Sequence, residues 1–151
     1  MAQTLWATLK AQKKLPPFTA IGIVTAAAEG LHAAHELRGA DGELLGVVHR
    51  DVAPQNIMIG YDGVVRVMDF GVAKAQGQLH HSRPGTLKGT LAYMAPEQLC
   101  GAQLDRRGDI FSLGVILWEA IACKRLFKST GQPLSISLLS IIRWLTAKLM
   151  G

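Results

Sequence analysis

The sequence predicts an α+β fold that is mainly α-helical and contains one small β-hairpin. Apolar residues recur every three to four positions through a segment that ends near His35, which is the period of a helix. Two short runs rich in β-branched residues, 56–59 and 64–68, flank a four-residue turn with an Asp-Gly pair, which is typical of a tight hairpin. An apolar run that begins at Asp109 is hydrophobic all round, and this predicts a helix buried in the core.

The N-terminal third of the chain is expected to be helical. Residues 3–14 can form a short amphipathic helix, which the Leu-Pro-Pro sequence at residues 15–17 ends. The apolar stripe of the following helix is Ile21, Val24, Ala28, Leu31 and His35. A polar loop at residues 39–46 comes next, and the Val-Val pair at residues 47–48 is a candidate for a short buried strand.

The predicted hairpin has functional consequences because antiparallel pairing brings its outer ends together. Asn56 opens the first strand and Asp69 follows the second, so their side chains are expected to lie close together. An amide oxygen and a carboxylate are ligands suited to a hard divalent cation. The hairpin therefore predicts a cation site shared by these two residues.

A long loop is expected between the hairpin and the buried helix. Residues 70–96 show little periodicity, are rich in Gly, Ser, Thr and His, and contain no acidic residue, and loops of such length usually serve a function. The fixed positive charges of this loop are Lys74, Arg83 and Lys88. After Phe127 the composition changes again, and residues 128–151 form a tail of different character.

Composition excludes several classes of protein. The chain has 151 residues, 49% of them hydrophobic and 18% charged, which argues against a disordered chain. Its net charge is +5, but the basic residues are scattered and form no five-residue run. A nucleic-acid partner is therefore not expected.

Cysteine usage and hydropathy favour a cytoplasmic location. Cys100 and Cys123 do not form a CxxC pair, so a zinc site is not expected and a reducing compartment is. The first residues lack the pattern of a secretion signal. The longest apolar runs are too short or too interrupted by charge for a membrane span to be assigned.

Four motifs occur in a fixed order along the chain. They are the segments 49–56 (HRDVAPQN), 69–71 (DFG), 89–97 (GTLAYMAPE) and 109–114 (DIFSLG). In this order and with these gaps, the sequence resembles the C-terminal lobe of a eukaryotic-type protein serine/threonine kinase, of the kind found in bacteria. The resemblance covers roughly residues 15–127. It implies a partial kinase domain over residues 1–127 and a divergent tail over residues 128–151.

The resemblance implies a phosphoryl-transfer site that uses ATP and Mg²⁺, with Mn²⁺ as a possible substitute. Asp51 corresponds to the catalytic carboxylate that orients the acceptor hydroxyl and takes its proton. Asn56 and Asp69 correspond to the metal ligands, and Asp69 thereby also contacts the nucleotide. Met58 corresponds to the apolar residue against the adenine ring. The open alternatives are a turn-capping role for Asp51 and a purely structural role in the hairpin for Met58.

The resemblance also implies regulation by phosphorylation. Thr86, four positions before Thr90, has the spacing of an activating phosphosite, and Ser82 is the second candidate. Arg50 would pair with that phosphate. Thr90 corresponds to the threonine that bonds the catalytic Asp, which argues for Ser/Thr rather than Tyr specificity. The alternative is an ordinary polar loop.

The remaining motif residues are implied to be structural anchors: His49, Phe70, Gly71, Glu97 and Asp109. His49 and Phe70 would hold the catalytic and metal loops in register by packing. Asp109 would accept backbone amides of the His-Arg-Asp segment, and its alternative is a plain helix cap. Glu97 would need an arginine partner, for which Arg125 and Arg143 are the candidates.

The sequence departs from the family pattern at two places. Ala53 stands where such kinases have a lysine that reaches the transferred phosphate, and no GxGxxG loop or Val-Ala-Ile-Lys strand occurs. The expected function is that of a serine/threonine kinase acting on proteins, in a truncated form that is not expected to catalyse transfer alone. The alternatives are a pseudokinase-like interaction fragment, which could also complement an N-lobe in trans, and a degenerate remnant. With its cleft face uncovered, the chain is expected to be marginally stable.

Overall fold

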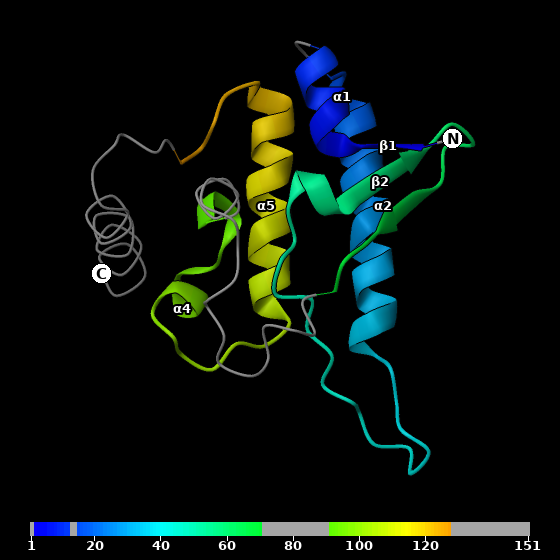
Figure 1. Ribbon diagram of the computed structural model, residues 1–151, viewed down its shortest axis with the longest axis vertical. Coiled ribbons are helices and arrows are strands. Elements are labelled where there is room, and N and C mark those ends of the chain that lie inside the picture. The colour runs from blue at the N-terminus through cyan, green and yellow to red at the C-terminus, as the bar shows by residue number, and fades with distance from the viewer. Residues whose placement is uncertain (1, 13–14, 71–90, 128–151) are drawn as a thin grey trace.

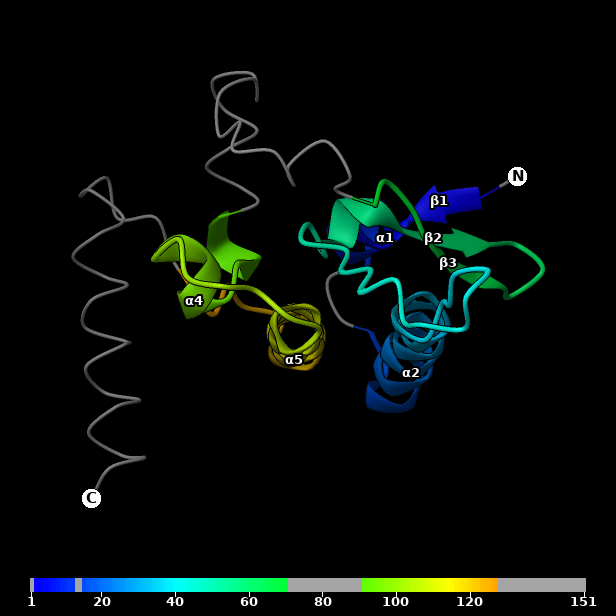
Figure 2. The same ribbon diagram turned by 90° about the horizontal axis from the view of Figure 1, so that it is seen from below.

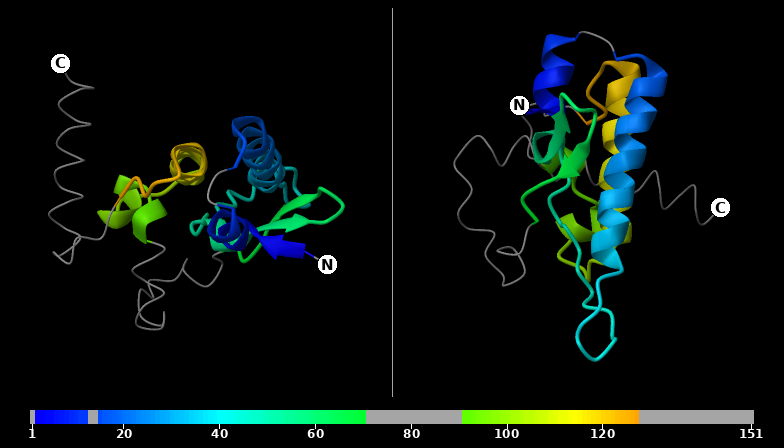
Figure 3. Two further views of the ribbon diagram at one scale, coloured as in Figure 1. Left: turned by 90° about the horizontal axis from the view of Figure 1, so that it is seen from above. Right: turned by 90° about the vertical axis from the view of Figure 1, so that its right-hand side faces the viewer.

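The structure is a computed structural model that describes residues 2–12, 15–70 and 91–127 (Figure 1). Two long helices, α2 (Pro17–His35) and α5 (Arg107–Ala122), pack side by side. A small sheet and the short helix α1 (Leu5–Ala11) lie together on one side of this pair (Figures 2 and 3). Helix α4 (Pro96–Leu99) lies on the side of α5 that faces away from α2 (Figure 2). The predicted α+β architecture, mainly helical with a small sheet, is confirmed for the described residues.

The described part of the sheet has three antiparallel strands in the order β1-β2-β3. They are β1 (Ala2–Thr4), β2 (Ile57–Gly60) and β3 (Val65–Val67). The predicted hairpin is therefore present as β2 and β3, with Met58 opposite Arg66. Gly63 takes a φ of +81° in the turn, which glycine adopts without steric cost. Asp62 does not take a positive φ; its carboxylate accepts the amide of Val64 instead (3.1 Å).

The beginning of the chain differs from the prediction. Residues 2–4 form strand β1, which pairs with β2 so that Thr4 lies opposite Met58. The first helix consequently begins at Leu5 and not at residue 3. Thr4 also caps this helix, because its hydroxyl accepts the amide of Ala7 (3.1 Å), a favourable arrangement at a helix N-terminus.

Helix α2 turns most of the predicted stripe towards the core, with Ile21 as the exception. Its buried residues are Ala20, Ile23, Ala27, Leu31, Ala34 and His35, whereas Ile21 is 45% exposed. Leu31 and His35 are buried as predicted, and Val24 and Ala28 are partly buried and pack against the core. The error at Ile21 arises because α2 packs against both α5 and β3, so that small alanines take the closest positions and Ile21 faces outwards.

The Val-Val pair at residues 47–48 does not form a strand. The preceding loop is closed by a single bridge between Arg38 and Leu44. Val47 instead lines an apolar cavity of about 450 Å³ beside the C-terminal end of α2, together with Leu37 and Phe70. Val47 and Val48 are half-buried here without strand pairing.

Helix α5 is buried on one face only, so the prediction of burial all round was wrong. The residues that face the core include Asp109, Ser112, Ile116 and Glu119. The exposed apolar residues of this helix are Ile110, Trp118 and Ile121. At its C-terminal end Cys123 takes a left-handed φ of +54° and donates its amide to the carbonyl of Glu119 (2.9 Å).

One hydrophobic core joins the three longer helices to β2 and to the turn before α4. Its fully buried large side chains include Leu5, Leu31, Ile57, Tyr93 and Ile116. They come from α1, α2, β2, the 3₁₀ turn η3 (Leu91–Tyr93) and α5. Among the described residues, no helix is both long and apolar enough to cross a membrane.

Candidate active site

The backbone of the His-Arg-Asp segment is fixed by the carboxylate of Asp109, which is only 1% exposed. One oxygen, Oδ2, accepts the amide of His49 (2.9 Å) and the Nε2–H of His35 (2.8 Å). The other, Oδ1, accepts the amide of Arg50 (3.0 Å). Burying a carboxylate is costly unless donors compensate its charge, and here two of the three donors are backbone amides of the candidate catalytic segment, while His35 on α2 supplies the third. Helix α5 therefore sets the position of that segment.

Arg50 takes a left-handed conformation with a φ of +66°, which costs a non-glycine residue about 1–2 kcal/mol. The strain is held from two sides. Asp109 accepts the Arg50 amide (3.0 Å), and the side-chain amide of Gln98 on α4 donates to the Arg50 carbonyl (2.7 Å). The sequence analysis missed Gln98, because nothing local to residue 98 indicates a bond to a residue 48 positions away.

The buried ring of His49 connects Asp51 with the segment that precedes Asp69. Its Nδ1 accepts the backbone amide of Asp51 (3.2 Å), and its Nε2 donates to the carbonyl of Met68 (2.9 Å). This pattern requires the ring proton on Nε2. The ring also packs against Phe70, with centroids 4.5 Å apart.

The candidate metal ligands lie at one end of the β2–β3 hairpin, close to Asp51. Asn56 ends the 3₁₀ turn η1 (Pro54–Asn56), and its Nδ2 donates to the Asp51 carbonyl (2.8 Å) with a longer contact to Oδ2 (3.4 Å). The amide of Met68 donates to the carbonyl of Asn56 (2.8 Å). Asp69 is the next residue and is exposed, with a φ of +57°. The structure thus brings these segments together, as antiparallel pairing requires.

These donors fit a magnesium or manganese ion bound together with phosphates. Because the NH₂ group of Asn56 bonds to Asp51, its carbonyl oxygen is the atom that can ligate a cation. The described residues contain no cluster of three or more His, Cys, Asp or Glu side chains suited to a metal. Magnesium does not require such a cage, since it commonly takes one or two protein oxygens and completes its shell with water and phosphate.

The other predicted site residues are placed as follows. Met58 is half-buried in β2, Ala53 is buried, and Glu97 lies in the first turn of α4. Arg125, a candidate partner for Glu97, pairs instead with Glu119 (3.5 Å). The remaining predicted residues lie outside the described part of the chain: Gly71, Ser82, Thr86, Thr90 and Arg143.

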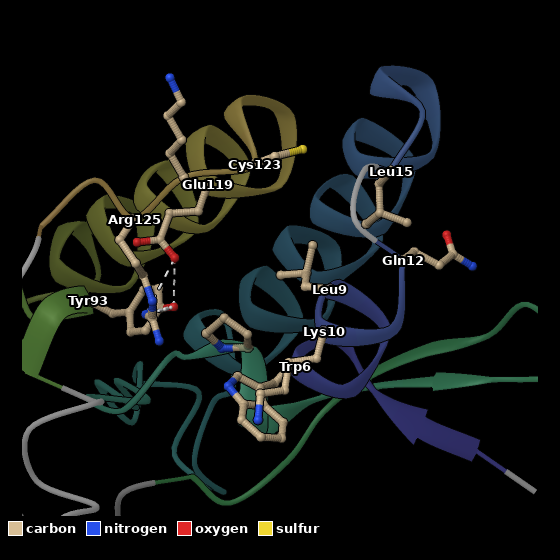
Figure 4. A pocket seen from close by; sticks show the side chains of 11 residues that line it. Trp6, Leu9, Lys10, Gln12, Leu15, Tyr93, Glu119, Cys123 and Arg125 are labelled. Carbon is tan, nitrogen blue, oxygen red and sulfur yellow. Dashed lines mark hydrogen bonds and ion pairs between the residues drawn. The ribbon is translucent and has the colours of Figure 1, made fainter.

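A cluster of Tyr93, Glu119 and Arg125 was not predicted from the sequence (Figure 4). The Tyr93 hydroxyl donates to Glu119 Oε2 (2.9 Å) and accepts Arg125 Nη1 (2.6 Å). Glu119 Oε1 accepts the amide of Leu126 (3.0 Å). Burial, followed by the nearby charge of Glu119, raises the pKa of the Tyr93 hydroxyl well above its usual range.

The raised pKa of Tyr93 makes a Tyr93→Phe variant informative at alkaline pH. Tyr93 is protonated in both states below its unfolded pKa near 10. At higher pH the unfolded chain loses this proton while the folded chain retains it, so folding stability falls as pH rises. At pH 8 we expect the variant to be about 1–3 kcal/mol less stable than the parent, because it leaves buried partners unsatisfied. That difference should shrink above pH 10 in urea unfolding.

The control for this prediction is Tyr61→Phe, since Tyr61 is the other tyrosine of the chain and its side chain is exposed. We expect its stability to follow that of the parent at every pH. A Tyr93→Phe deficit that stays constant between pH 8 and pH 11 would contradict the role given to the buried hydroxyl.

Comparison with known proteins identifies the family. Residues 1–146 match the protein kinase domain. The chain is 52% identical to tyrosine-protein kinase MasK of Myxococcus xanthus (strain DK1622) over 101 residues, which covers 67% of this chain and 16% of MasK. It is 41% identical to the probable serine/threonine-protein kinase pknA2 of Bifidobacterium longum (strain NCC 2705) over 107 residues, 71% of this chain and 13% of that relative.

A third relative is the serine/threonine-protein kinase PknA of Corynebacterium glutamicum, which is 36% identical over 119 residues, 79% of this chain and 24% of PknA. The aligned parts thus span between 13% and 24% of the length of these three curated relatives. Because the domain match extends over nearly the whole sequence, the chain belongs to the protein kinase domain family.

Proposed function

We propose that this chain provides the catalytic and metal-binding part of a bacterial protein kinase that transfers the γ-phosphoryl group of ATP to Ser or Thr hydroxyls of proteins. The observation that carries the proposal is the convergence of Asp51, Asn56 and the Asp69 segment at one end of the β2–β3 hairpin. The fold described above would then be the C-terminal lobe of the kinase, with residues 1–127 as its domain portion and 128–151 as a divergent tail.

The proposed mechanism assigns a separate role to each of these side chains. Asp51 would accept a hydrogen bond from the acceptor hydroxyl, orient it and take its proton late in transfer. Asn56 and Asp69 would hold the cation through their oxygen atoms. When bound, ATP would supply the phosphoryl group and the cation would neutralise charge on the phosphates. Since Asn56 bonds the backbone of Asp51, metal binding and base positioning would depend on each other.

The acceptor specificity rests on the sequence around Thr90. This threonine lies in a Gly-Thr-x-x-Tyr motif, and two of the relatives compared above are named as serine/threonine kinases. The relative with 52% identity is named as a tyrosine kinase, so the acceptor has to be measured. We also propose Thr86, with Ser82 as the second candidate, as the phosphosite that pairs with Arg50.

The nucleotide needs further contacts beyond those that this sequence contains. The sequence has no Gly-rich phosphate loop, and we propose that another segment, in the same polypeptide or in a partner protein, grips the phosphates. Binding of such a partner without transfer is the second candidate function. Buried Ala53 favours it, because this position supplies no charge to the transferred phosphate.

The proposal is tested with the full 151-residue chain in two assays. The first measures thermal stabilisation by ATP with and without Mg²⁺ or Mn²⁺. An ATP concentration of about 100 times Kd adds about 2.7 kcal/mol to the free energy of unfolding. We expect cation-dependent stabilisation in the parent and in Asp51→Asn, and its loss in Asp69→Ala. Asp41→Ala, which removes an exposed carboxylate from the loop after α2, is the matched control and should behave as the parent.

The second assay measures transfer from radiolabelled ATP to dephosphorylated casein, followed by phosphoamino acid analysis. The rate of any phosphate transfer should be at least about 100-fold lower in Asp51→Asn than in the parent. The labelled phosphate should be found on Ser or Thr. Equal incorporation by the parent and Asp51→Asn would reject the catalytic assignment. Cation-dependent binding of ATP without phosphate transfer would favour the second candidate function. In the first assay, stabilisation of Asp69→Ala equal to that of the parent would reject the metal site.

A further inference from the structure

A groove of about 280 Å³ lies between α1, η1 and the C-terminal end of α5 (Figure 4). One wall is apolar and is formed by Trp6, Leu9, Leu15 and Pro54. The other wall carries the cluster of Tyr93, Glu119 and Arg125. The groove thus combines a hydrophobic surface with a few polar groups that converge on it, which is the usual composition of a binding site.

The groove is connected to the candidate active site through two segments of the chain. Pro54 belongs to η1 and is three residues after Asp51. Tyr93 belongs to η3 and is three residues after Thr90, the residue assigned to the acceptor side. A polypeptide that presents a hydroxyl to Asp51 would therefore pass close to this groove.

The charges exposed in the groove are positive, although it contains a glutamate. Glu119 is buried, with a side chain only 7% exposed. Its carboxylate is already bonded by the Tyr93 hydroxyl and the Leu126 amide, with Arg125 3.5 Å away. The Arg125 side chain is 43% exposed and has five N–H donors, so it can bond outwards as well. Lys10 adds a second cation above the ring of Trp6, 4.3 Å from its centroid.

We propose that this groove binds an acidic side chain of the polypeptide substrate, with a neighbouring apolar residue of that substrate on the Trp6 wall. The proposal rests on the proposed function, because it assumes that the chain presents a polypeptide to Asp51. Arg125 is its specificity-determining residue. This arginine shields Glu119 from the substrate and offers the carboxylate of the substrate a planar set of donors, to which carboxylates bind well.

Removal of Arg125 should change the charges that line the groove and thereby its selectivity. The carboxylate of Glu119 would keep the Tyr93 and Leu126 donors but would lose the nearby positive charge. The groove would keep Lys10 and Lys124 as cations but would lose the planar donors of Arg125. The preference for an acidic residue opposite Arg125 should then disappear, and a loss confined to particular peptide positions is not what a role for Arg125 in folding alone predicts.

The experiment measures binding, without ATP, to an array of serine-centred peptides that carry a leucine and one Glu, Gln or Lys at each of five positions on either side. We expect the full chain to prefer Glu over Lys about two- to fivefold at one or more positions, the range typical of partly exposed ion pairs. Arg125→Gln should abolish this preference at the same positions. Arg125→Lys keeps the charge and should retain a preference for Glu.

The matched control is Lys124→Gln, which removes the same charge from the neighbouring residue and leaves the donors of Glu119 in place. It should weaken the preference for Glu without abolishing it. Thermal unfolding of each variant establishes that it is folded. The proposal is overturned if the parent shows no preference for Glu, or if Arg125→Gln has the same profile as the parent.

Peptide binding also separates this proposal from the proposed function. Asp51→Asn should bind the array as the parent does, because the substituted atoms take no part in the groove. Selective binding of acidic peptides by a chain that transfers no phosphate would support the groove and not the catalytic assignment. Transfer of phosphate by a chain that shows no selectivity for Glu would support the catalytic assignment and not the groove.

Discussion

Replacing Asp109 with alanine is expected to destabilise the fold by about 3–5 kcal/mol, the range found when one partner of a buried charged network is removed. The substitution leaves the Nε2–H of His35 and the amides of His49 and Arg50 without their common acceptor. Small domains are stable by only 5–15 kcal/mol in general. Urea unfolding at neutral pH should therefore show a large decrease in midpoint, or no folded baseline at all.

Two further variants test the cause of this effect. Asp105→Ala removes an exposed carboxylate just before α5, which accepts the backbone amide of the neighbouring Arg107 and pairs with its guanidinium, so its unfolding midpoint should fall only slightly, much less than that of Asp109→Ala. Asp109→Asn keeps the shape of the side chain but places an NH₂ group against the N–H donors that the carboxylate accepts. This variant should therefore remain clearly less stable than the parent. If Asp109→Asn is as stable as the parent, the shape of the side chain and not its acceptor atoms holds the segment.

Truncation of Leu31 to alanine is expected to cost about 2–5 kcal/mol, because it leaves a cavity between packed elements. Leu31 lies in the middle of α2, is 0% exposed and belongs to the core that joins α2 to α5. The same substitution at Leu37, which is 50% exposed, is the matched control and should cost less than about 1 kcal/mol. Equal losses at the two positions in thermal unfolding would contradict the position assigned to the core.

The features that the sequence predicted well depend on local patterns. The hairpin was predicted because an Asp-Gly turn and two β-branched runs lie within about a dozen residues, and the structure contains it as β2 and β3. Helix α2 was predicted from periodicity and α5 from a continuous apolar run, but for both helices burial was predicted at positions that are exposed. Ile21 and Trp118 are exposed because the neighbours of α2 and α5 determine which face is covered, and a hydrophobic pattern does not identify those neighbours.

The features that were missed depend on partners distant in sequence. Strand β1 has three residues and no pattern of its own, and it forms because β2 offers an edge to pair with. The bond from Gln98 to Arg50 spans 48 positions, and that from Tyr93 to Glu119 spans 26. Such contacts become visible only when the tertiary structure brings the elements together. The candidate catalytic and metal residues could be named in advance because they occur in recognisable motifs.

The two cysteines of this chain provide a practical means of observing it. Both thiols are free and exposed, and Cys123 lies on the wall of the groove beside Arg125. A maleimide fluorophore would react at these two positions without any engineered residue, and a Cys100→Ser background would confine the dye to Cys123. The emission of that dye would then report directly when a peptide enters or leaves.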